Sequence, residues 1–193
     1  MTVAFDRRNL PHLQRDMKPH FLTFCTENPW ILPGEVRALV LRSCIHDHET
    51  KLFVFCAVVM PDHAHLVFVP LVDHRKREVI ALATITPAIK GASAHNINRA
   101  LGRKGTVWQE ESFDHVLRSF EALDQKIEYV LNNPVRAGLV TRAEDYPWLW
   151  QAQNKNVCHC LASRRRPSSR RPRHPRLGAG NQGGVIGFVE GAI

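Results

Sequence analysis

Two strongly apolar runs, separated by a short polar break, constrain the fold more than any other feature of the chain. Residues 51–60 read KLFVFCAVVM, and their β-branched and aromatic side chains indicate a central strand buried on both faces. The break PDHA at residues 61–64 leads directly into HLVFVP at residues 65–70. This arrangement predicts a hairpin of two long strands inside a sheet.

The flanking segments alternate between strand and helix patterns. HFLTFCTE at residues 20–27 is a short strand pattern, and residues 34–50 have apolar positions at helical spacing. A helical stretch runs from residue 78 to 101, interrupted near Pro87, and residues 106–119 indicate one strand or a tight pair of strands. The order β, α, β, β, α, β predicts an α+β fold, a ferredoxin-like split βαβ sandwich with an antiparallel sheet and two helices on one face.

Two histidines lie at the start of the second apolar run. Because strand side chains alternate between faces, His63 and His65 project from the same side, one pleat apart, which suits two ligands of one ion. In the alternative interpretation, both are polar positions on a half-exposed strand. The HxHxDH pattern of metallo-β-lactamases is absent because Leu66 and Val67 follow His65. A phosphate-binding glycine loop and a GxSxG motif are absent as well.

A further helix is predicted after the sandwich, with Ser119 as its N-cap and Asn132, Asn133 and Pro134 at its end. Its apolar side chains form one stripe, whereas Tyr129 lies on the opposite side, and Asn133 shares the face of Tyr129 one turn later. An exposed tyrosine on a helix is usually a surface residue. Beside an ion held by two histidines and an amide oxygen, however, its hydroxyl can attack a phosphate.

The charge of the chain is unevenly distributed. Residues 153–193 contain Lys155 and seven arginines against Glu190 alone, and therefore carry nearly all of the net charge of +8. We expect a folded domain over residues 1–152 and a basic, disordered tail over residues 153–193. Without a long apolar run or a segment typical of a signal peptide, the expected protein is cytoplasmic, has no membrane partner and keeps its five cysteines reduced.

Four segments carry a resemblance to a known family. VVMPDHAHLVFVP at residues 58–70, KGASAHNINRALGRKG at 90–105, GTVWQEESFDHVLR at 105–118 and IEYVLNNPVRAGLV at 127–140 resemble the single-tyrosine transposases of the HUH superfamily. The REP-associated tyrosine transposases, related to the IS200-like transposases, are the most similar group. The resemblance covers about residues 18–150 and implies an HUH-nuclease sandwich with an added C-terminal helix that carries the catalytic tyrosine.

The resemblance also implies a mechanism. His63, His65 and Asn133 would bind Mg2+ or Mn2+, and Tyr129 would attack single-stranded DNA to form a 5′-phosphotyrosine link and a free 3′-hydroxyl. The expected function is a metal-dependent single-strand endonuclease and strand transferase acting on hairpin or repeat-flanked DNA. A single-strand nucleic-acid-binding protein without catalysis and a phosphodiesterase without a covalent step are alternatives. The sequence leaves a homodimer open.

Weaker patterns supply candidates for DNA contacts outside the metal site. Phosphates are candidate ligands of basic and amide side chains, and Trp108 is a candidate for stacking on a base, although it can equally be a core residue. His115 matches the family pattern without an assigned role. The candidate phosphate ligands are Lys90, Asn98, Arg99, Arg118 and Arg136.

Deletion of residues 161–193 tests the role of the tail. This segment contains all seven arginines of the tail, whereas the predicted active-site residues precede it. We expect weaker DNA binding with a smaller salt dependence, by roughly 0.7 in the logarithmic slope for each lost phosphate contact on a single strand. Cleavage at low salt should remain. An unchanged slope in binding measurements at several salt concentrations would show that the tail does not contact DNA.

Overall fold

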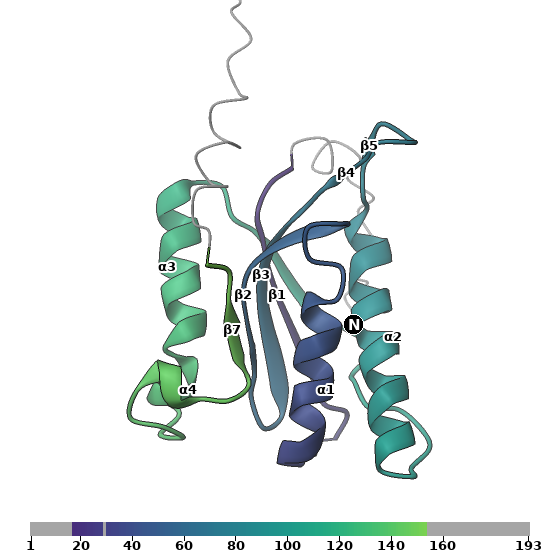
Figure 1. Cartoon of the computed structure of the whole chain (residues 1–193), viewed down its shortest axis with the longest axis vertical. Coiled ribbons are helices and arrows are strands. Elements are labelled where there is room, and N and C mark those ends of the chain that lie inside the picture. Colours follow the sequence, from purple (N-terminus) through teal and green to yellow (C-terminus); the bar gives the residue numbers. More distant parts are fainter. Residues whose placement is uncertain (1–16, 29, 154–193) are drawn as a thin grey trace, which may run out of the picture. The chain divides into compact units, whose positions relative to one another are not determined.

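The computed structural model describes residues 17–28 and 30–153, so the predicted tail lies outside the described residues. Strands and helices follow one another in the predicted order, with short additions (Figure 1). The elements are β1 His20–Cys25, α1 Gly34–Ile45, β2 Leu52–Val59, β3 His63–Pro70, β4 Val72–Asp73, β5 Glu78–Val79, α2 Leu82–Ala100, β6 Phe113–Val116, α3 Phe120–Leu131, α4 Asn133–Arg136, a 3-10 turn Ala143–Asp145 and β7 Leu149–Gln151.

Five strands form one sheet in the order β6-β1-β3-β2-β7, and every neighbouring pair is antiparallel. β2 and β3 form the predicted hairpin, and every residue of β2 is buried. Helices α1 and α2 cover one face of the sheet, and α3 lies on the other side (Figure 1). The first four strands have the ferredoxin-like order, which confirms the predicted fold class; β7 extends the sheet beside β2.

The main core lies between the sheet and the helix pair α1 and α2. Leu22 of β1 and Leu66 of β3 project into it, and so do side chains spaced four residues apart on each helix, such as Val36 and Val40 of α1. Strand alternation therefore places Phe21 and His65 on the opposite face, toward α3. The apolar pattern of the strands thus determines which side chains face away from the main core and are available for a functional site.

The second helix differs from its prediction in two ways. It begins at Leu82 rather than at residue 78, because β4 and β5 form a short hairpin before it. It also continues through Pro87. Proline removes one helical N–H, the one that would bond to the carbonyl of Ala83, but both residues are exposed, so water can satisfy that carbonyl. None of the helices in the described part of the chain has the length and apolar character to span a membrane.

Trp108 is a core residue, contrary to its suggested role as a base-stacking side chain. It is 4% exposed, packs edge-on against Phe24 with ring centroids 4.8 Å apart, and donates its indole N–H to Ser93 Oγ at 2.9 Å. Asn98 also has a structural contact, because its amide donates to the carbonyl of Gly105 at 2.8 Å. Both side chains fasten the segment after α2 to the sandwich.

Lys90 holds the next part of the segment after α2 in place through hydrogen bonds. This structural role differs from its predicted role as a phosphate ligand. Its ammonium group donates to the carbonyls of Gln109 and Glu110 at 2.7 and 2.9 Å and to Ser112 Oγ at 3.0 Å. An ammonium group has three donor hydrogens, so these contacts occupy all of them. Arg99 is exposed on α2, a helix on the opposite face of the sheet from α3 (Figure 1).

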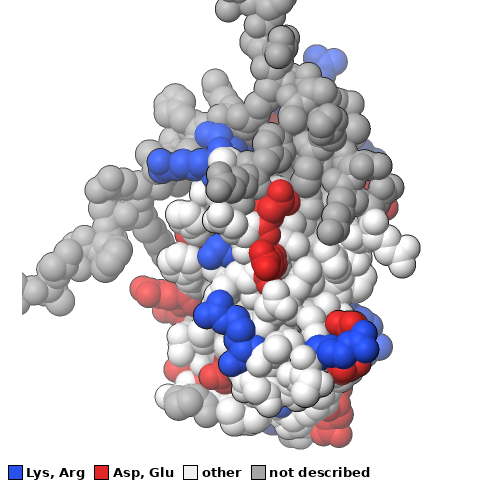
Figure 2. Space-filling model, turned by 90° about the vertical axis from the view of Figure 1, so that its left-hand side faces the viewer, with Lys and Arg blue, Asp and Glu red and all other residues white. Residues whose placement is uncertain are grey.

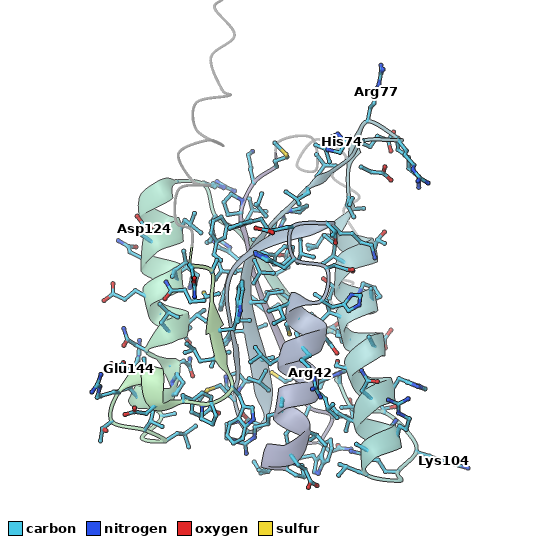
Figure 3. All side chains as sticks on the ribbon, in the orientation of Figure 1. Arg42, His74, Arg77, Lys104, Asp124 and Glu144 are labelled. Atoms are coloured by element: carbon cyan, nitrogen blue, oxygen red, sulfur yellow. The ribbon has the colours of Figure 1, made fainter. Side chains whose placement is uncertain are left out.

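The substitution Lys90→Met tests this structural role. We expect the free energy of unfolding, measured by chemical denaturation, to fall by about 1–2 kcal/mol, because three hydrogen bonds of a charged donor are lost. Lys104→Met is the matched control, since Lys104 is exposed and projects away from the loop after α2 (Figure 3). A stability change as small as that of the control would contradict the role of Lys90 as a fastening residue.

Candidate active site

His63 and His65 lie on the face of β3 that is turned toward α3. Their ring centroids are 4.6 Å apart at an interplanar angle of 67°. The two residues differ in burial, since the side chain of His63 is 24% exposed whereas His65 as a whole is 6% exposed. Both rings lie outside the main core, yet His65 is enclosed, so the pair is not simply the polar side of a half-exposed strand.

Each histidine has one ring nitrogen held by a neighbour. Asp62 Oδ1 lies 2.6 Å from Nδ1 of His63, and Thr23 Oγ1 lies 2.7 Å from Nδ1 of His65. Thr23 reaches His65 because the two residues are directly opposite in the pairing of β1 with β3. When Nδ1 carries the hydrogen and donates it to these oxygens, Nε2 of each ring retains a lone pair for a ligand.

Burial keeps His65 in its neutral form. The pKa of His65 is lowered to about 3, first by burial and then by electrostatic interaction with His63 and Lys126, whereas Asp62 acts in the opposite direction. An unprotonated imidazole is the form that binds a cation. The environment of His65 therefore favours ligand binding over a permanent positive charge.

Tyr129 approaches the histidines from α3. The helix begins as predicted, with the Ser119 side chain accepting a hydrogen bond from the Ala122 N–H at 3.0 Å, and Leu123 and Val130 are buried. The expected position of Tyr129 on the side opposite this stripe is wrong, because its ring is half-buried and lies against side chains of the sheet. Its ring centroid lies 5.7 Å from that of His65 and 6.1 Å from that of Phe21, so the tyrosine faces the histidine side of the sheet.

Two cationic side chains flank the tyrosine. Lys126 Nζ lies 4.4 Å from the ring centroid of Phe21 and 4.9 Å from that of Tyr129, and Arg136 Cζ lies 5.3 Å from the ring centroid of Tyr129. Positive charges at these positions favour an anion, such as a phosphate group, beside the tyrosine hydroxyl. Sequence reasoning did not identify Lys126, although its position three residues before Tyr129 puts it on the same helical face.

A groove of about 710 Å³ opens beside Tyr129, between β6 and α3. His115 and Leu117 line one side, and Lys126, Tyr129, Asn132 and Arg136 line the other. Its volume is in the range of sites that hold ligands, about 300–1,000 Å³. Viewed from the side of α3, basic and acidic side chains alternate rather than forming one uniform basic surface (Figure 2).

Asn133 lies just after the end of α3, in the short helix α4. α3 ends at Leu131, and Asn132 lies between the two helices with φ −86° and ψ −1°. The lining of the groove includes Asn132. Within residues 17–28 and 30–153, no group of three or more His, Cys, Asp or Glu side chains is arranged to hold a metal ion. A third ligand would have to be of another kind, and Asn133 stays a prediction.

The six predicted DNA-contact residues divide between the two faces of the molecule. Arg136 lines the groove, and Arg118 is exposed in the connection from β6 to α3. The other four belong to α2 and the segment after it, away from the groove: Lys90, Asn98, Arg99 and Trp108. Sequence reasoning gave no role to His115, which lines the groove, and did not consider Phe113. The alternating pattern FDH of a strand is the signal that relates them.

Comparison with known proteins gives one similar curated sequence and a solved structure of the same kind. The chain is 26% identical over 120 residues to a protein of Haemophilus influenzae described as a "putative REP-associated tyrosine transposase". The match covers 60% of this chain and 66% of the relative, slightly less than two thirds of its length. No protein-family model matches the chain.

The solved structure is that of a REP-associated tyrosine transposase bound to a REP hairpin. It superposes with a TM-score of 0.54 and 19% sequence identity, over 76% of this chain and 82% of that chain. At this identity the structural match concerns the fold, and it supports the predicted mixed sandwich. Together, the two comparisons confirm that this chain resembles the REP-associated tyrosine transposases in sequence and in fold.

Proposed function

We propose that the protein is a metal-dependent single-strand DNA endonuclease and strand transferase, a transposase that acts through Tyr129. The observation that supports this most directly is the meeting of three rings from two separate elements. The ring centroid of Tyr129, on α3, lies 5.7 Å from that of His65, and the ring centroid of His65 lies 4.6 Å from that of His63. A nucleophile beside two potential cation ligands is the arrangement that phosphoryl transfer to a tyrosine needs.

The surroundings of the two histidines suit a divalent cation. Their Nδ1 atoms have oxygen partners, and His65 is kept neutral by burial. His63 and His65 would hold Mg2+ or Mn2+, with Asn133 as the proposed third ligand. When bound, such a cation supplies positive charge that polarises the phosphate and stabilises the charge developing in the transition state.

The side chains of the protein account for the remaining parts of the reaction. Lys126 and Arg136 hold the phosphate beside the hydroxyl of Tyr129, which gives up its proton to solvent or to a base. The tyrosine oxygen then bonds to phosphorus while the bond from phosphorus to the 3′ oxygen breaks, and that oxygen leaves as a 3′-hydroxyl after taking up a proton. Since the new link is again a phosphodiester, another 3′-hydroxyl can reverse the reaction and join a different strand.

The proposed substrate is single-stranded DNA next to a hairpin. The solved transposase of similar fold was bound to a REP hairpin, which makes a folded DNA end the natural first candidate. A nucleic-acid-binding protein without turnover would use the same groove, and a hydrolytic phosphodiesterase would use the same histidines. Formation of a covalent protein–DNA adduct distinguishes the proposed enzyme from both.

The substitution Tyr129→Phe tests the nucleophile, since it removes a single oxygen atom. We expect it to abolish the covalent adduct while DNA binding persists. The measurement is denaturing gel electrophoresis after incubation with an oligonucleotide labelled at its 3′ end, because the strand on the 3′ side of the cut stays on the protein. Peptide mass mapping of the wild-type adduct locates the modified residue.

Tyr146→Phe is the control, because Tyr129 and Tyr146 are the two tyrosines of the chain. Tyr146 is buried, and its hydroxyl donates to the carbonyl of Val59 at 2.9 Å. The control variant should lose some stability, about 1 kcal/mol, and keep the adduct. An adduct that persists in Tyr129→Phe, or that maps to Tyr146, would refute the mechanism.

The substitutions His63→Ala and His65→Ala test the cation site. Each should reduce cleavage by more than the roughly 10–100-fold loss that is typical when a residue merely orients a ligand. Cleavage is measured with Mg2+ and with Mn2+, and Mn2+ should give the higher activity because imidazole binds transition metals better. His95→Ala, at an exposed position of α2, is the matched control. Wild-type cleavage by His65→Ala would remove the basis for the cation site.

A further inference from the structure

Phe113 is an unusually exposed aromatic side chain next to the groove. It is 59% exposed and lies on the edge strand β6, whereas Phe21 on the neighbouring strand β1 is buried. Its ring is nearly parallel to that of His115, at an interplanar angle of 11° with centroids 6.4 Å apart. Within the described residues, these two exposed, nearly parallel rings on one strand leave much of their surface uncovered.

The position of this ring pair relates it to the candidate active site. In the pairing of β1 with β6, Phe113 is opposite Thr23 and His115 is opposite Phe21. Thr23 in turn contacts His65, and the ring of Phe21 contacts that of Tyr129. Phe113 also packs against Phe21, with centroids 6.3 Å apart. The exposed pair therefore continues a row of rings that ends at the tyrosine and the histidines.

The charge of the groove indicates what kind of molecule can lie on these rings. The groove is lined by two cationic side chains, Lys126 and Arg136, and by one carboxylate, that of Glu128. Lys126 and Arg136 lie over the ring of Tyr129, where their positive charges suit a phosphodiester backbone. An anionic polymer with flat, apolar groups matches both the cations and the rings. In a duplex the bases are already paired and stacked, so the faces that such rings contact are available in unpaired nucleotides.

We propose that Phe113 and His115 form a stacking platform for an unpaired base of the single-stranded DNA whose phosphate reaches Tyr129. This inference rests on the proposed function and adds a base-binding subsite to it. The platform holds one nucleotide by its π-face, so it requires a base without selecting its identity. It also fixes the register of the strand relative to the tyrosine, because Phe113 and Tyr129 contact the same ring of Phe21.

The first experiment measures binding of a fluorescent single-stranded oligonucleotide to the full-length protein by anisotropy, with a chelator present so that no cleavage occurs. We expect Phe113→Ala to weaken binding by about 5- to 150-fold, the range for loss of one base–aromatic stack. His115→Ala should also weaken binding. Phe113→Trp should retain the wild-type affinity, because it restores a flat ring.

Ile31→Ala is the matched control for the loss of an exposed apolar side chain. Ile31 is 58% exposed, almost the same as Phe113, and it precedes α1. It should leave binding unchanged. A duplex of the same sequence should bind Phe113→Ala and the wild-type protein equally well. A Phe113→Ala variant that weakens single-strand and duplex binding alike would contradict the platform.

The second experiment replaces each base of the oligonucleotide in turn by an abasic site. Wild-type protein should lose affinity at one position by a factor similar to that of Phe113→Ala, and the variant should be insensitive to the same replacement. Such non-additivity identifies the base that contacts the ring. Additive losses at every position would refute the contact.

The outcomes for this inference and for the proposed function can be told apart. If Phe113→Ala binds single strands like the wild-type protein while Tyr129 still forms an adduct, the platform is refuted and the proposed function stands. If the wild-type protein binds no single-stranded DNA at all, both are refuted. If the platform variants behave as expected and no adduct forms, the protein binds single strands without the proposed chemistry.

Discussion

The pairing of β1 with β3 is the constraint on which the site depends. It places Thr23 opposite His65 and Cys25 opposite His63, and the same register places Leu22 opposite Leu66. Because side chains alternate along a strand, a shift by one residue would exchange the core face and the site face. The buried leucines, packed under α1 and α2, therefore determine which way the histidines point.

The two faces of the sheet illustrate how differently burial acts on apolar and polar side chains. On the side of α1 and α2, enclosure of leucine, valine and phenylalanine stabilises the fold. On the other side, His65 is nearly as enclosed, and its burial is tolerated because Thr23 partners one ring nitrogen. The same burial favours the uncharged imidazole, so the local packing that the fold imposes also prepares the residue to bind a cation.

The periodicity of the sequence predicted the features that depend on local residue patterns. It did not predict side-chain contacts between residues that are far apart in the chain. The hairpin, the shared face of His63 and His65, and the Ser119 cap follow from alternation and capping rules. The roles of Lys90 and Trp108 depend on carbonyls and a hydroxyl brought near by the folding of the segment after α2, which no local pattern reveals.

Incomplete coverage of the sheet explains why a groove exists beside Tyr129. α3 packs on β2 and β3 through side chains such as Leu123 and Val130, and β7 completes that half of the sheet. In the described part of the chain, no helix gives comparable cover to the opposite edge, β6, on the same face, so Phe113 is exposed there and His115 borders the groove. Tyr129 lies at the boundary between the covered and the open half. A nucleophile at that boundary is held by packing on one side and is accessible to a polymeric substrate on the other, which a fully covered sheet would not allow.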